Sequence, residues 1–172
     1  RYEPFTICDP KQRLIHKASV RDRLLHQALV SAIEPSFERQ FIYDSYSCRK
    51  GKGIHSGVKR LNTFLRQASN NNTRTVYALK CDVKQFFASV DHEVLRQLLR
   101  VHIQDPGILS LLDETINSLY SSPSKGIPLG NLTSQLFANI YLHELDWFIK
   151  QTLKEKHYLR YCDDFIILST NR

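Results

Sequence analysis

Methionine, paired cysteines and long apolar runs are all missing from this sequence of 172 residues. Without methionine the natural start lies elsewhere, so we expect a piece of a longer protein. No CxxC pair and no histidine cluster of zinc spacing is present, which indicates free thiols in a reducing compartment. The longest apolar stretches, such as residues 136–142, are far shorter than the ~20 residues of a membrane span. We therefore expect a cytoplasmic chain with no membrane partner.

Acidic residues are scarce in the first part of the chain. Residues 1–60 carry 12 Lys and Arg but only 6 Asp and Glu, whereas residues 81–172 carry 9 and 11. The formal net charge of the whole chain is +7. A basic front half and a mildly acidic back half favour a polyanion partner beside a cation-binding site. A solvated surface with a chance asymmetry is equally compatible with these counts.

Hydrophobic periodicity predicts a mainly helical chain. The expected helices span residues 21–34, 58–68, 91–103, 108–120 and 134–154. The first helix is expected to bury Leu24, Leu25, Leu29 and Ile33 and to end at Pro35. Loops are expected at residues 44–57, 69–75 and 121–130, where glycine, proline or polar residues gather.

Two β-rich segments place aspartates at their ends. Residues 76–83 contain Asp82, and residues 158–168 have the pattern of a hairpin with Asp163 and Asp164 at its tip. Adjacent aspartates at a turn are often turn formers only. Apolar residues flank this pair on both sides, so its carboxylates are expected at the edge of a buried sheet. Like charges repel there unless a cation neutralises them.

Three aspartates at the ends of neighbouring strands suit a pair of Mg²⁺ ions, with Mn²⁺ as a substitute. Mg²⁺ prefers oxygen ligands and combines one or two carboxylates with substrate phosphates. Two such ions roughly 3.5–4 Å apart serve in-line phosphoryl transfer in polymerases and nucleases. We therefore expect Asp82, Asp163 and Asp164 to be the catalytic, metal-binding residues of a nucleotidyl transfer.

The order of the motifs resembles the palm of a reverse transcriptase. The motifs are KCDVKQFFASVDHEVL, then GIPLGNLTSQLFANIYL, then YCDD. In the front half, RLIHKASVRDRLLHQAL and FIYDSYSCRKGKGIHSGVKRL resemble the fingers of prokaryotic, group II intron-like reverse transcriptases. The resemblance covers nearly the whole chain. It implies an α+β right-hand polymerase fragment with fingers at residues 1–75 and a palm at 76–172, truncated at both ends. A small antiparallel sheet backed by helices would form the palm, and the thumb would follow Arg172.

One motif narrows the resemblance further. Most such enzymes carry Pro-Gln-Gly followed by Ser-Pro, whereas this chain has Pro128, Leu129 and Gly130, then Ser134 and Gln135. This pattern resembles the reverse transcriptases of diversity-generating retroelements, in which loss of the Gln is linked to error-prone copying, above all at template adenines. Leu129 offers bulk without a donor or acceptor for the incoming nucleotide, which weakens selection. As plainer alternatives, Leu129 is a loop hydrophobe, Ser134 a helix cap and Gln135 a first-turn residue.

The resemblance also assigns further site residues. The nucleotide-binding residues are Lys11, Arg13, Phe87, Leu129, Gly130 and Gln135. Phe87 would block a ribose 2′-hydroxyl and so favour deoxynucleotides, with core packing as its alternative role. Lys11 and Arg13 would contact the triphosphate, since the guanidinium fork suits phosphate oxygens. Val83 joins Asp82 among the metal ligands.

Three basic residues lie in the glycine-containing loop at residues 44–57. Arg49, Lys50 and Lys52 are expected to follow a nucleic-acid backbone, and a merely solvated loop is the alternative. Asp91 is expected to cap the helix that follows it. Asp146 is placed on a helix face without a role.

The sequence thus predicts an RNA-directed DNA polymerase of a prokaryotic cytoplasm. Its partners would be an RNA template, a DNA or RNA primer and deoxynucleoside triphosphates, and the resemblance adds a small basic accessory protein. Alternatives are a retron, abortive-infection or intron-type reverse transcriptase, or a nucleic-acid-binding palm module without activity. An RNA-dependent RNA polymerase is disfavoured by Phe87, and a metal-dependent nuclease by the basic front half.

Overall fold

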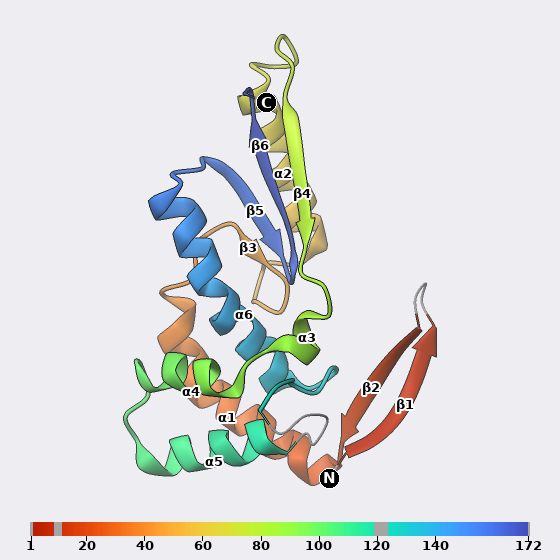
Figure 1. Cartoon of the computed structure of the whole chain (residues 1–172), viewed down its shortest axis with the longest axis vertical. Coiled ribbons are helices and arrows are strands. Elements are labelled where there is room, and N and C mark those ends of the chain that lie inside the picture. Colours follow the sequence, from red (N-terminus) through yellow and green to blue (C-terminus); the bar gives the residue numbers. More distant parts are fainter. Residues whose placement is uncertain (1, 9–11, 119–123, 172) are drawn as a thin grey trace. The chain divides into compact units, whose positions relative to one another are not determined.

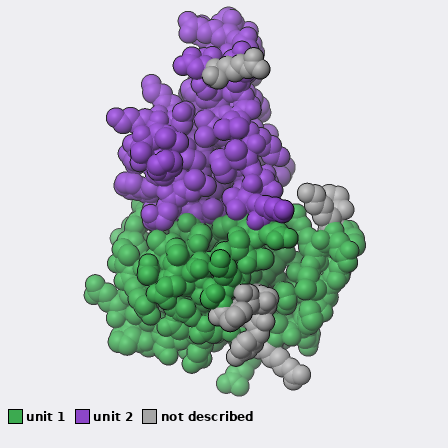
Figure 2. All heavy atoms as spheres, viewed as in Figure 1, with its two compact units in different colours: residues 1–40, 85–141 green, residues 41–84, 142–172 purple. Residues whose placement is uncertain are grey.

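The computed structural model describes residues 2–8, 12–118 and 124–171 (Figure 1). The chain forms two compact units, shown in Figure 2: unit 1 contains residues 1–40 and 85–141, and unit 2 contains residues 41–84 and 142–172. Each unit therefore combines residues from both halves of the chain. The expected fingers and palm, divided at residue 75, are a different division and stay a prediction. Within the described ranges, no helix is long and apolar enough to cross a membrane.

Unit 1 is a helical bundle with one attached hairpin. Its elements are β1 (Tyr2–Cys8), β2 (Gln12–Ala18), α1 (Val20–Glu38), α3 (Phe86–Ser89), α4 (His92–Arg100), α5 (Pro106–Asn117) and the first part of α6 (Leu132–Trp147). Strands β1 and β2 pair antiparallel, with Tyr2 opposite Ala18. The buried core of the bundle includes Leu29, Ile33, Leu95, Leu99, Leu112, Ile116, Phe137 and Ile140. Most of the hairpin is exposed, so its position depends on a few contacts at its base.

Helix α1 differs from the sequence prediction at its end and on its buried face. Pro35 lies inside the helix, which continues to Glu38 although proline removes one backbone donor. Phe37 is only 3% exposed, and burying its ring stabilises the turn that follows the proline. Leu24 and Leu25 were expected in the core but are 69% and 39% exposed. The buried face instead consists of His26, Leu29, Val30, Ile33 and Phe37.

Aspartates cap the next two long helices of unit 1. The carboxylate of Asp91 accepts hydrogen bonds from the backbone nitrogens of Glu93 and Val94, at 2.9 and 3.2 Å, as the sequence predicted. Asp105 caps α5 in the same way. Helix α5 begins at Pro106, two residues before the expected start at residue 108. A proline suits this position because the first backbone nitrogens of a helix have no partner within it.

Helix α6 begins two residues earlier than expected, at Leu132. Ser134 is therefore no N-cap: it lies buried in the first turn, and the backbone nitrogen of Gln135 donates to Asn131 O at 3.2 Å. The helix was predicted to reach residue 154. It instead continues at Phe148–Thr152 as a π-helical turn, η1. In a π-helix the backbone hydrogen bonds join residues five apart rather than four apart.

Unit 2 is a four-stranded sheet covered by a helix. Its elements are β3 (Ser45–Tyr46), α2 (Ile54–Ala68), β4 (Tyr77–Asp82), β5 (His157–Tyr161), β6 (Asp164–Ser169), the end of α6 and η1. The strand order is β3-β5-β6-β4, and all pairs are antiparallel except β3 with β5. Helix α2 packs on one face, where Tyr46, Phe64, Leu159 and Leu168 form a buried cluster (Figure 1). The small antiparallel sheet predicted from the sequence is confirmed.

The segment expected to be a loop at residues 44–57 is more ordered than predicted. It contains β3, and α2 begins at Ile54 rather than at Val58. Val58 is 52% exposed, so the buried face of α2 is narrower than the apolar pattern suggested. Strand β3 could not be recognised because two residues carry no periodicity; its pairing with β5 depends on chain segments that are distant in sequence.

Candidate active site

The acidic residues meet at one edge of the sheet in unit 2. Asp82 ends β4 and Asp164 begins β6, and the two are direct partners in the antiparallel register. Asp163 comes immediately before, in the turn that joins β5 to β6, where Tyr161 pairs with Asp164. The hairpin with an acidic tip is thus confirmed. The register adds what the sequence could not show, namely that Asp82 lies across from Asp164.

Few charges on the described residues balance this pair. Lys80 Nζ lies 3.8 Å from Asp164 Oδ1, but the two side chains are 70% and 50% exposed. Such a solvated pair contributes at most ~1 kcal/mol, and like charges directly opposite on a sheet are destabilising. Among residues 2–8, 12–118 and 124–171, no three His, Cys, Asp or Glu side chains converge as a ready-made metal site. The residue types nevertheless fit a hard divalent cation, because two aspartates are direct partners on adjacent strands and carboxylate oxygens are the ligands such cations prefer.

The turn that carries the aspartates has an unusual residue at its first position. Cys162 has a φ of 56°, in the left-handed region that favours glycine. Its backbone nitrogen donates to Tyr46 O at 3.2 Å, which ties the turn to β3. Burial, and next the charge of Asp163, raise the pKa of the Cys162 thiol to about 11. The thiol is therefore neutral at physiological pH and adds no negative charge to the three aspartates at this edge.

Within unit 1, the loop before α6 is fastened to the segment that carries Phe87. Ile127 N donates to Phe87 O and Gly126 N donates to Val90 O, both at 2.8 Å. The imidazole of His92 donates from Nε2 to Gly126 O at 2.6 Å. These bonds fix the backbone just ahead of the Pro-Leu-Gly motif, so the motif has a defined position relative to α3.

The same loop is also bonded to strand β2. His16 N donates to Leu129 O at 3.1 Å, and Asn131 Nδ2 donates back to His16 O at 2.9 Å. Gly130 lies between them with a φ of +101°, and a Cβ built there would stand 2.7 Å from Ile15 Cγ2. The structure thus brings Leu129 and Gly130 to the strand on which Arg13 lies exposed, three residues from His16. Lys11, the other predicted triphosphate contact, lies outside the described residues.

The two phenylalanines after Asp82 have different surroundings. Phe86 is 3% exposed and Phe87 is half-buried, so Phe86 belongs to the core. The rings meet edge to face, with centroids 5.5 Å apart. Gln135 is half-buried in the first turn of α6. The candidate metal ligands lie in unit 2, and the described nucleotide-binding candidates lie in unit 1.

Two of the three basic loop residues make contacts inside unit 2. Arg49 Nη1 donates to Ile42 O, Ser45 O and Ser45 Oγ, at 2.9, 2.7 and 2.6 Å. Lys52 Nζ donates to Tyr43 O at 2.8 Å and stands 3.2 Å from the centre of the Tyr43 ring. Both side chains order the loop, whereas Lys50 is exposed to solvent.

Sequence reasoning missed Asp146, to which it gave no role. This residue is fully buried, and its carboxylate lies 2.7 Å from the guanidinium of Arg160, which is also fully buried. A signal was present: Asp146 is four residues after Leu142 and three before Ile149, so it shares the buried face of the helix. A charge on such a face requires a partner, and Arg160 is the basic residue in the expected hairpin.

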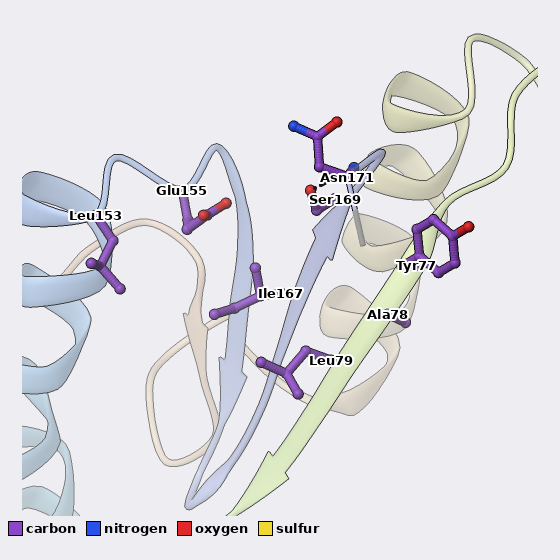
Figure 3. Close-up of a pocket in the computed structure, with 8 residues that line it drawn as sticks. All are labelled: Tyr77, Ala78, Leu79, Leu153, Glu155, Ile167, Ser169 and Asn171. Carbon is purple, nitrogen blue, oxygen red and sulfur yellow. Dashed lines mark hydrogen bonds between the residues drawn. The ribbon is translucent and has the colours of Figure 1, made fainter.

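A hollow lies at the opposite end of the same sheet from the aspartates (Figure 3). Its lining comes from β4, β6 and the segment after η1, and consists of Tyr77, Ala78, Leu79, Leu153, Glu155, Ile167, Ser169 and Asn171. With a single carboxylate and a mostly apolar wall, it does not have the chemistry of a metal or phosphate site.

Comparison with known proteins assigns the chain to a family. Residues 9–172 match the family described as "Reverse transcriptase (RNA-dependent DNA polymerase)". The chain belongs to the reverse transcriptase family. Protein YkfC of Escherichia coli (strain K12) is 29% identical over 147 residues, which cover 82% of this chain and 38% of that protein. Group II intron-encoded protein LtrA of Lactococcus lactis subsp. cremoris is also 29% identical, over 82% of this chain and 23% of its own length.

Solved structures confirm the fold. The structure of telomerase from Candida tropicalis in complex with a TWJ fragment of telomeric RNA has a TM-score of 0.70 at 13% identity, over 99% of this chain and 36% of that one. The apo telomerase of the same organism, truncated from its C-terminal domain, has a TM-score of 0.62 at 15% identity, over 99% and 44%. The α+β polymerase fold predicted from the sequence is therefore correct. The chain spans less than half the length of each of these relatives.

Proposed function

We propose that this chain is the polymerising part of an RNA-directed DNA polymerase that copies an RNA template by nucleotidyl transfer. The observation that carries the proposal is the acidic edge of unit 2. Asp82 and Asp164 face each other across β4 and β6, and Asp163 adjoins them in the turn. Membership of the reverse transcriptase family supports the same reaction.

Asp82, Asp163 and Asp164 would hold two Mg²⁺ ions, with Val83 as a further ligand. When bound, such ions stabilise the charge that develops on the attacking and leaving oxygens of an in-line displacement. The sheet supplies the carboxylates from two paired strands and one tight turn, so the ligands approach from fixed backbone positions. Cation binding would also relieve the repulsion between Asp82 and Asp164, which Lys80 offsets only weakly.

Residues of unit 1 would receive the deoxynucleoside triphosphate. Phe87 is half-buried, and its backbone oxygen accepts a hydrogen bond from Ile127 N. Its ring would exclude a ribose 2′-hydroxyl. Arg13 on β2 would contact the triphosphate together with Lys11, because a guanidinium forks onto phosphate oxygens. Gly130, which is exposed and lacks a side chain, and Gln135 would complete the nucleotide contacts.

Neutralising single aspartates tests the metal assignment. In the full-length protein, Asp82→Asn and Asp163→Asn are each expected to abolish Mg²⁺-dependent primer extension on an RNA template while the protein stays folded, because the shape is kept and the ligand charge is lost. Asp105→Asn is the matched control, since asparagine also caps a helix and this cap lies in unit 1. Near wild-type extension by either site variant would contradict the two-metal assignment.

We further propose that the enzyme is of the diversity-generating type and copies adenines with frequent errors. Leu129 supports this subtype, since its side chain is half-buried next to β2 and has no hydrogen-bonding group. The alternatives are a retron, abortive-infection or intron-type reverse transcriptase. The similarity to an intron-encoded protein supports the intron type. A nucleic-acid-binding module without activity is a further alternative. The presence of all three aspartates argues against it.

The variant Leu129→Gln separates these subtypes. An added amide can hold the incoming nucleotide, and one ordinary hydrogen bond is worth about 1 kcal/mol, or about fivefold fewer errors. The measurement is the sequence of complementary DNA made from one defined RNA by both full-length enzymes at equal Mg²⁺. If wild-type errors show no excess at adenines, or if Leu129→Gln leaves them unchanged, the diversity-generating subtype is wrong and an ordinary reverse transcriptase is the better account.

The proposed partners are an RNA template, a DNA or RNA primer and deoxynucleoside triphosphates. Lys50 on the exposed part of the basic loop, with Arg49 and Lys52 beside it, would follow the nucleic-acid backbone. A small basic accessory protein is proposed with the diversity-generating subtype. Relatives in Escherichia coli and Lactococcus lactis support a prokaryotic cytoplasm as the compartment.

A further inference from the structure

Three polar side chains are buried together between β5 and the C-terminal end of α6. Asp146, Tyr158 and Arg160, which we name the Asp146 cluster, each have a relative exposure of 0%. Arg160 Nε donates to Asp146 Oδ1 at 2.8 Å and Nη2 donates to Oδ2 at 2.7 Å, a forked pair. The hydroxyl of Tyr158 donates to Asp146 Oδ1 at 2.6 Å. The carboxylate therefore accepts three hydrogen bonds.

The charges of the cluster are stable at neutral pH. Burial opposes the charge of Arg160, but the hydrogen bonds and the charge of Asp146 outweigh it and raise the pKa of the guanidinium. Burial, and next the Asp146 carboxylate, raise the pKa of Tyr158. Arg160 is therefore charged and Tyr158 is protonated, so both are donors throughout the physiological range.

Arg160 also reaches the turn that carries the catalytic aspartates. Its Nη1 donates to Cys162 O at 2.9 Å. The nitrogen of Cys162 donates to Tyr46 O, so both backbone polar groups of this left-handed residue are held. Asp163 is the next residue along the chain. The guanidinium thus connects a buried carboxylate to the peptide group from which Asp163 extends.

Stability alone does not account for such a cluster. Taking two charges out of water is so unfavourable that apolar side chains of similar volume often give an equally stable or more stable protein. Apolar side chains at these three positions would lack the hydrogen-bond donor that Arg160 provides to Cys162 O. A non-glycine residue at positive φ is strained and keeps that conformation only where its surroundings enforce it.

We propose that Asp146 and Arg160 are positioning residues, which fix the carbonyl of Cys162 so that Asp163 and Asp164 keep the orientation needed to bind divalent cations. Tyr158 holds the carboxylate in place for this purpose. The inference rests on the proposed polymerase function and deepens it. It assigns the buried pair of Asp146 and Arg160 a role in shaping the metal-binding turn. The positions of the three catalytic aspartates do not by themselves show this role.

The test replaces the whole cluster by apolar residues in the full-length protein. The triple variant Asp146→Leu, Tyr158→Phe, Arg160→Met leaves no buried charge unpaired and is expected to melt within about 5 °C of wild type. We expect kcat for primer extension to fall about 10- to 100-fold with little change in KM for the nucleotide, because the ligands are misplaced. Two readouts do not depend on activity: weaker Mn²⁺ binding without nucleotide, and at least about tenfold faster amide exchange at Cys162.

A control variant removes a different Arg–Asp ion pair, in unit 1. Arg96 Nε lies 2.9 Å from Asp113 Oδ1 between α4 and α5, and the pair is partly exposed. Arg96→Met with Asp113→Leu is expected to leave kcat and Mn²⁺ binding within about twofold of wild type. A triple variant that folds and also stays within twofold in kcat, Mn²⁺ affinity and Cys162 exchange would overturn the positioning role.

A second variant keeps the inference testable if the triple variant does not fold. Arg160→Lys retains the buried charge, but one ammonium group cannot replace the fork to Asp146 and also bond Cys162 O. It is expected to fold, with kcat and Mn²⁺ affinity between those of wild type and a metal-ligand variant; wild-type values would refute the proposal. If wild type itself neither extends primers nor binds Mn²⁺, the polymerase proposal is the one that fails, and exchange at Cys162 still reports on the turn.

Discussion

One added methyl group at Gly130 should destabilise unit 1. Its φ of +101° lies outside the range that side-chain-bearing residues adopt readily, and a Cβ would stand 2.7 Å from Ile15 Cγ2. The methyl belongs to a β-branched residue on a paired strand, so rotation about χ1 gives little relief. Gly130→Ala therefore combines backbone strain with overpacking.

The expected magnitude follows from these two effects. Backbone strain at such a φ is about 1–3 kcal/mol, and one extra methyl in a tight contact costs about 1–3 kcal/mol. Since the loop can shift slightly, we expect Gly130→Ala to lower the free energy of unfolding by about 2–4 kcal/mol, measured by urea denaturation. Combining it with Ile15→Ala removes the opposing methyl, so the double variant should lose less than the sum of the single variants.

Gly53→Ala is the control for this experiment. Gly53 has an ordinary φ of −79° and no atom within 4 Å of an added Cβ. We expect a loss below about 1 kcal/mol, because Gly53 is the N-cap of α2 and alanine is a poorer N-cap than glycine. A loss below 1 kcal/mol for Gly130→Ala, or strict additivity with Ile15→Ala, would refute the reasoning. The contact between Gly130 and β2 would then not hold the loop that carries Leu129.

Three further predictions concern pH, sugar selection and the basic loop. Burial, and next the nearby positive charges, lower the pKa of His157, and burial lowers the pKa of His26. The unfolded state therefore binds protons at a higher pH than the folded state, so the free energy of unfolding should fall as the pH drops below 6.5. Replacing both histidines by glutamine should make this pH dependence weaker. Phe87→Ala should admit ribonucleotides, reducing discrimination by ~2 kcal/mol or about 30-fold in competitive primer extension; unchanged discrimination would assign the ring to the core. Lys50→Ala should weaken RNA binding and reduce its salt dependence without affecting stability. Arg49→Ala should lower the melting temperature, because three hydrogen bonds are lost. A loss of stability in Lys50→Ala with an unchanged melting temperature in Arg49→Ala would contradict these two roles.

Local patterns explain why much of the site was predictable. The run ending in Asp82 and the hairpin around Asp163 and Asp164 are short segments rich in β-forming residues, and a turn interrupts the hairpin, which sequence alone displays. The cap at Asp91 depends on two neighbouring backbone nitrogens and was equally accessible. By contrast, the buried face of α1 was misjudged because Leu25 and His26 are adjacent, and only the packing against other helices selects between them.

By itself the sequence determined which chemistry is present: three carboxylates in β-turn surroundings, a basic front half and a leucine in place of an amide. The tertiary structure decided which of these groups meet. It placed Asp82 opposite Asp164 and bonded Leu129 to β2. It also made Asp146, which the sequence placed on a helix face without a role, the partner of Arg160. The reason is physical: turns and caps depend on neighbours a few residues away, whereas register and the burial of charge depend on segments that only the folded chain brings together.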